Sequence, residues 1–84
     1  MNKNQIENLV HRMVSKISLE LLDIFKNEDC FQVIEKFSKS KIFEKLFDFE
    51  TELWRESPDY IIECYLEELG ELDLLKEFRG KNYD

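Results

Sequence analysis

Hydrophobic side chains recur with the period of an α-helix along almost the whole chain, and this pattern limits the fold more than any other feature. In residues 4–26 they advance by about 100° per residue and so fall on one side of a helix. One proline and two glycines leave few positions that interrupt helices. No stretch alternates apolar and polar residues as a half-buried strand does. The sequence therefore predicts an all-α fold, a small bundle of four to five helices.

Capping residues divide the chain into these helices. Asp29 is predicted to cap a short second helix, and Ser40 a third helix that runs to about residue 56. Ser57 and Pro58 give the clearest start signal, because serine caps the backbone and proline suits the first helical position.

The two glycines follow helical patterns near the end of the chain. Gly70 is predicted to end the fourth helix as its C′ residue, and Gly80 to end a final short helix. We expect a single helical domain over residues 1–80, followed by a frayed tail at residues 81–84.

The composition argues against several classes of protein. A net charge of −7 disfavours direct binding to nucleic acid or to an anionic membrane. We expect a cytoplasmic protein, since the sequence shows neither a signal peptide nor a membrane-spanning stretch. Cys30 and Cys64 are expected to remain free thiols rather than to form a disulfide. With His11 as the one histidine and no Gly-rich phosphate loop, we expect no enzyme activity, no metal and no cofactor.

Acidic residues concentrate in the second half of the chain. Residues 46–84 contain twelve acidic and four basic side chains, whereas residues 1–45 contain seven and eight. Like charges four residues apart destabilise a helix by about 0.2–0.5 kcal/mol per pair, so such rows need a reason. Two rows with this interval are predicted on the third and fourth helices: Glu44, Asp48, Glu52 and Glu56, then Asp59, Glu63 and Glu67, with Glu71 continuing the second row.

A charge run of this kind is either a solvated face or a binding surface for a basic partner. The fourth helix mixes no base into its row, which favours the binding interpretation. Tyr60 projects beside Glu63 and Glu67 and is expected to anchor the partner, although it could instead pack at a helix corner. The predicted partner-binding residues are Glu52, Glu56, Asp59, Tyr60, Glu63, Glu67 and Glu71.

These observations predict a small acidic protein that neutralises a basic partner. An immunity protein or antitoxin that occludes a nuclease-type toxin fits best, because nuclease sites are basic. One alternative is a DNA mimic that inhibits a host defence or regulatory protein. Another is a structural or regulatory homo-oligomer that joins through apolar side chains, which are otherwise expected in the core: Leu19, Leu22, Phe31, Phe37 and Phe49.

Overall fold

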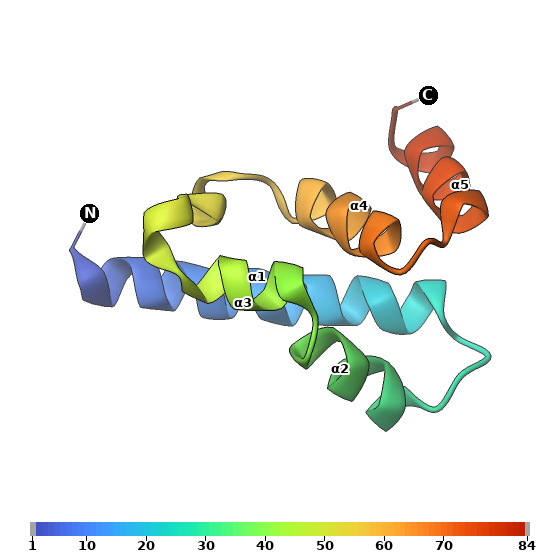
Figure 1. Cartoon of the computed structure of the whole chain (residues 1–84), viewed down its shortest axis with the longest axis horizontal. Coiled ribbons are helices and arrows are strands. Elements are labelled where there is room, and N and C mark those ends of the chain that lie inside the picture. Colours follow the sequence, from blue (N-terminus) through green and yellow to red (C-terminus); the bar gives the residue numbers. More distant parts are fainter. Residues whose placement is uncertain (1, 84) are drawn as a thin grey trace.

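The backbone forms five α-helices and no strand over residues 2–83, which are the residues that the computed structural model describes (Figure 1). The predicted all-α bundle of four to five helices is confirmed. Two single-turn 3-10 helices, η1 (Phe49–Thr51) and η2 (Leu53–Arg55), connect the third α-helix to the fourth. The α-helices are α1 (Lys3–Ile24), α2 (Cys30–Ser38), α3 (Lys41–Phe47), α4 (Pro58–Glu68) and α5 (Leu72–Tyr83). None of these helices combines the length and the apolar character that crossing a bilayer requires.

Side-chain caps begin three of the helices, α2, α3 and α4, where the sequence predicts them. The Asp29 carboxylate accepts hydrogen bonds from two backbone N–H groups in the first turn of α2. The Ser40 hydroxyl accepts from the Phe43 N–H at 3.2 Å, and the Ser57 hydroxyl accepts from the Tyr60 N–H at 3.2 Å. Each of these bonds satisfies a backbone donor that has no partner within its helix.

Only one of the two glycines ends a helix. Gly70 adopts a φ of +73°, and the next N–H group, that of Glu71, donates to the Leu66 carbonyl at 3.0 Å. The predicted end at Gly80 is wrong, because Gly80 does not take a left-handed conformation and α5 continues to Tyr83. Residues 81–83 of the predicted tail thus lie in a helix, and residue 84 lies outside the described residues.

The third helix is much shorter than predicted, because polar side chains after Phe47 bind the backbone locally. The Thr51 hydroxyl donates to the carbonyls of Lys45 and Asp48, each at 2.8 Å. Glu52 then takes a left-handed φ of 56°. Such local bonds compete with the α-helical pattern and favour tighter turns. The predicted row along this helix is therefore wrong, since only the first of its members lies on α3: Glu44, Asp48, Glu52 and Glu56.

Helix α4 lies at the centre of the packing. It runs alongside α1 and also contacts α3 and α5, while α2 and α5 extend on opposite sides of the α1–α4 pair (Figure 1). Each helix contributes apolar side chains to one core, which buries Val10, Met13, Ile17 and Leu21 of α1, Val33 and Phe37 of α2, Ile42 and Leu46 of α3, Ile61, Ile62, Tyr65 and Leu66 of α4, and Leu75 and Phe78 of α5.

The five apolar residues that were predicted to lie either in the core or at an oligomer interface differ in burial. Phe37 is 1% exposed, and Leu22 and Phe49 pack against the core. Leu19 and Phe31 are 71% and 76% exposed, so the expectation that they lie in the core is wrong. Each lies two positions from a core residue on its helix, and two residues correspond to a rotation of about 200°.

Two leucines of α1 test the distinction between buried and exposed positions on this helix. We expect Leu21→Ala to lower the free energy of unfolding by about 2–5 kcal/mol, because Leu21 is fully buried. Leu19→Ala, the same change on the exposed side, should alter it by less than about 0.5 kcal/mol. Urea unfolding followed by circular dichroism measures both, and equal effects would contradict the assigned orientation of α1.

Candidate functional site

The acidic side chains of α4 point to different neighbours rather than forming one surface. Glu63 is only 13% exposed, and its Oε1 lies 2.6 Å from Nε of Arg79 on α5. Glu68 turns the other way, toward α3. The charge of Glu63, one of the predicted partner-binding residues, is therefore already matched by a cation of the same chain.

Glu68 caps a helix that lies far from it in sequence. Its two carboxylate oxygens accept hydrogen bonds from the backbone N–H groups of Lys41, at 2.9 Å, and Ile42, at 3.0 Å. A carboxylate is unfavourable at the C-terminal end of its own helix, α4, because the helix dipole is negative there. The same carboxylate is favourable at the N-terminal end of α3, where backbone N–H groups lack partners within the helix. Glu68 thus links α3 to α4.

Tyr60 lies in a cluster formed by the outer side of α4 and by Glu56, which precedes this helix. We call it the Tyr60 cluster and define it as Glu56, Tyr60, Cys64 and Glu67. The phenol is 45% exposed. Its hydrogen bond to the Cys64 thiol raises the pKa of Tyr60 most, and the charges of Glu56 and Glu67 raise that pKa further. Burial raises the pKa of the Cys64 thiol, so this group stays protonated near neutral pH.

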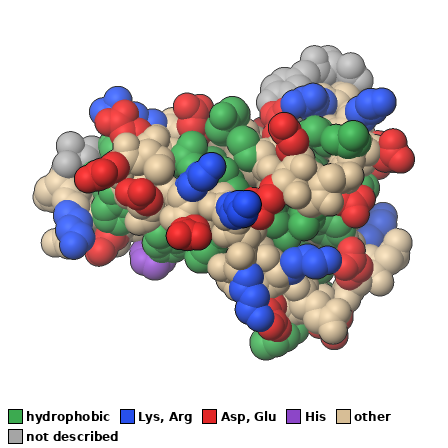
Figure 2. All heavy atoms as spheres, in the orientation of Figure 1, with side chains coloured by type: hydrophobic (Ala, Val, Ile, Leu, Met, Phe, Trp, Pro, Cys, Tyr) green, Lys and Arg blue, Asp and Glu red, His purple; other side chains and the backbone are tan. Residues whose placement is uncertain are grey.

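The Tyr60 cluster borders a groove that also contains basic residues. The groove has a volume of about 480 Å³ and lies between α3 and α4, with Lys41 and Lys45 on the α3 side. Ile42 and Leu53 add apolar surface to it. Figure 2 shows acidic and basic side chains interspersed over this face of the molecule, so its charge is mixed rather than uniformly negative.

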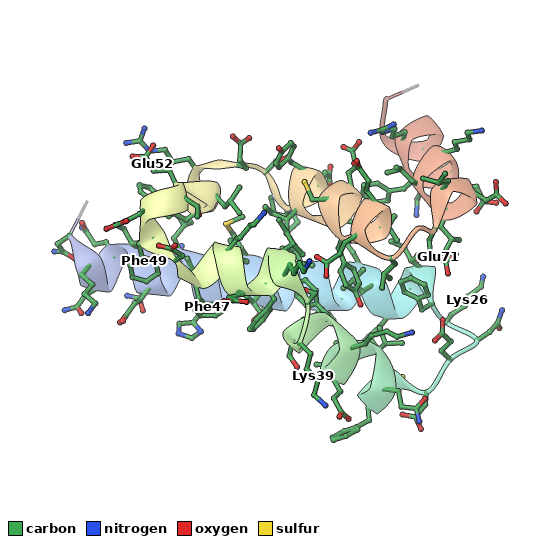
Figure 3. All side chains as sticks on the ribbon, viewed as in Figure 1. Lys26, Lys39, Phe47, Phe49, Glu52 and Glu71 are labelled. Carbon is green, nitrogen blue, oxygen red and sulfur yellow. The ribbon has the colours of Figure 1, made fainter. Side chains whose placement is uncertain are left out.

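The remaining predicted residues lie elsewhere. Oε2 of Glu52 is 3.6 Å from Nη1 of Arg55, and Asp59 is half-buried in the first turn of α4. Glu71 borders a cavity of about 90 Å³. Glu52 and Glu71 lie at opposite ends of the long axis (Figure 3). Of the seven predicted residues, the structure brings together Glu56, Tyr60 and Glu67.

A second groove, outside the predicted site, lies between α1 and η2. We call it the Trp54 groove. Its volume is about 450 Å³, and it is lined by apolar Leu9, Met13, Trp54 and Pro58, by basic Arg12, Lys16 and Arg55, and by Glu56. The spacing of Arg12 and Lys16 places both on one side of a helix, which is a readable signal. Their proximity to Arg55 depends on the tertiary fold.

Cys30 and His11 line neither of these grooves. Cys30 and Cys64 are free, as predicted. The exposed ring of His11 contacts Phe47 at a centroid distance of 5.8 Å. Within residues 2–83, no three acidic, histidine or cysteine side chains come close enough to share a metal ion.

No known protein family, curated protein or solved structure matches the chain. The interpretation of the site therefore depends on the residues described above.

Neighbouring glutamates test the link between α3 and α4. Glu68→Ala removes both bonds to the α3 backbone, and we expect the free energy of unfolding to fall by about 1–2 kcal/mol. Glu67→Ala removes the same charge from an exposed position and should change the free energy of unfolding by less than about 0.5 kcal/mol. Denaturant unfolding of both variants provides the measurement, and a silent Glu68→Ala would contradict the assigned cap.

The two thiols should differ in reactivity toward a disulfide reagent. Cys30 is exposed, whereas Cys64 is partly buried and has a raised pKa. Because the thiolate is the reacting form, we expect Cys30 to react about tenfold faster at neutral pH. Cys30→Ser should remove the fast phase of the reaction with the reagent, and Cys64→Ser should remove the slow phase. Identical rates for the two single-cysteine variants would count against the assigned environment of Cys64.

Proposed function

We propose that this chain is a small non-catalytic binding module that captures a basic protein through the Tyr60 cluster. The observation that carries the proposal is an exposed tyrosine between two carboxylates. Glu56 and Glu67 form no ion pair with another described residue, and both act electrostatically on the Tyr60 phenol. A rigid aromatic ring supplies contact area at an interface, and the two carboxylates supply attraction for lysine or arginine.

The net charge supports the same function at longer range. A charge of −7 on 84 residues accelerates the approach of a positively charged partner. Nuclease-type toxins present such surfaces, because their active sites bind phosphates. We therefore propose an immunity protein or antitoxin, acting in the cytoplasm by covering the basic site of its toxin.

The lysines of α3 determine where cations of the partner can bind. Lys41 and Lys45 line the same groove as Glu67, and Lys45 acts electrostatically on Cys64. Lysine or arginine side chains of a partner should therefore contact Glu67 on the outer side of α4 and Glu56 just before this helix. The apolar part of the interface would then cover Tyr60.

Charge reversals test this arrangement. In a low-salt pull-down from extract of the source cells, we expect Glu56→Lys with Glu67→Lys to weaken capture of the basic partner at least about tenfold, corresponding to about 1.4 kcal/mol. Lys45→Glu removes a repulsive cation and should strengthen capture. Glu77→Lys on α5, an exposed reversal outside the cluster, is the control. Mass spectrometry identifies the captured protein.

The outcomes separate the proposed function from its alternatives. A captured nuclease-type toxin supports the antitoxin proposal, whereas a DNA-binding regulatory or defence protein supports the DNA mimic. Capture that depends on the exposed Leu19 and Phe31 but not on the Tyr60 cluster would contradict both. Light scattering at tens of micromolar, about the usual working range, tests the homo-oligomer, for which a dimer should be lost in variants of these two apolar residues.

A further inference from the structure

We propose that the Trp54 groove binds a short acidic segment of another protein, with an apolar side chain of that segment seated on Trp54. Leu9, Met13, Trp54 and Pro58 provide the apolar surface, and three of the four charged lining residues are cations. A local excess of positive charge on a protein of net charge −7 is complementary to an acidic ligand. This site differs from the Tyr60 cluster in the charge of the ligand it attracts.

Two of the three cations of this groove come from neighbouring turns of α1. Arg12 and Lys16 form no ion pair with another described residue, and they lie one helical turn apart, with Cβ atoms about 5–6 Å from each other. Two carboxylates separated by one residue in an extended peptide span about 7 Å, which matches this spacing. Both cations can therefore bind acidic side chains of one short segment.

Trp54 and Arg55 complete a preformed surface. The indole Nε1–H donates to the Phe49 carbonyl at 3.2 Å, which orients the ring. The Arg55 guanidinium carbon lies 5.1 Å from the centroid of the Trp54 ring, within the range of a cation–π contact. The ion pair of Arg55 with Glu52 is long, at 3.6 Å, and exposed, so it contributes little and can yield to a new carboxylate.

These contacts favour a peptide over a nucleic acid. Arg55 covers one face of the indole, which leaves less of the ring for a base to stack on, whereas an apolar side chain of the segment can contact the remaining surface together with Leu9 and Pro58. The net charge of −7 repels a chain of phosphates along its whole length, whereas a short acidic segment interacts mainly within a Debye length of about 10 Å. The volume of about 450 Å³ is sufficient for one apolar side chain of the segment together with its backbone.

Trp54 is the only tryptophan of the chain, so its fluorescence reports directly on this groove. The probe is a short capped peptide of aspartate and glutamate residues around one leucine, titrated into the full chain in about 0.1 M salt, where the Debye length is about 10 Å. We expect a saturable change in Trp54 emission that weakens as salt is raised. Lys16→Glu and Arg12→Glu, each on the exposed side of α1, should raise the dissociation constant at least about tenfold.

Lys26→Glu is the matched control, because it makes the same charge change at the end of the molecule opposite Glu52 (Figure 3). It should alter the dissociation constant by less than about twofold. Glu67→Lys should not weaken peptide binding, which separates this test from that of the Tyr60 cluster. Circular dichroism checks that each variant is folded.

Four results would overturn the proposal. The first is an unchanged Trp54 emission up to about 1 mM peptide, the range of the weakest specific binding. The second is an equal loss of affinity in Lys26→Glu, which would indicate attraction by net charge alone. The third is equal binding of a peptide with serine in place of leucine. The fourth is tighter binding of an oligothymidylate than of the peptide, which would identify a nucleic-acid site instead.

Discussion

Burial of one side of α4 is the contact on which the rest of the structure depends. Ile61, Ile62, Tyr65 and Leu66 are each at most 1% exposed, and this helix contacts α1, α3 and α5. A helix of eleven residues is barely stable alone in water, so tertiary packing rather than helix propensity holds it in place. The orientation of this apolar side in turn determines the direction of every acidic side chain on α4.

The orientation of α4 directs its acidic side chains toward different neighbours, although the sequence concentrates them in one segment. Glu63 lies on the flank that meets α5 and pairs with Arg79, and Glu68 lies on the flank that meets α3 and caps it. Tyr60 and Glu67 remain on the outer side. The acidic surface offered to other molecules is consequently smaller than the charge count suggests, and two of the acids contribute to contacts between helices instead.

The parts of the structure that the sequence predicts are those that depend on adjacent residues. The caps by Asp29 and Ser57 and the turn at Gly70 each involve bonds within a few positions, so side-chain chemistry alone indicates them. Hydrophobic periodicity did not reveal the early end of α3, because bonds from the Thr51 hydroxyl to the backbone leave that pattern unchanged. The pairing of Glu63 with Arg79 is a tertiary contact, and such contacts leave no signal in a single sequence. The Trp54 groove could not be predicted for the same reason, because it joins segments that lie far apart in the chain.

The pattern of helix contacts also bears on how the chain assembles. Many of the main contacts join consecutive helices, α1 with α2, α2 with α3, α3 with α4 and α4 with α5, whereas the contacts of α1 with α4 and with η2 join distant segments. The entropy lost in closing a long loop therefore arises mainly when η2 and α4 pack onto α1. Chains dominated by such local contacts belong to the fast-folding class, which reaches the native state within microseconds to milliseconds.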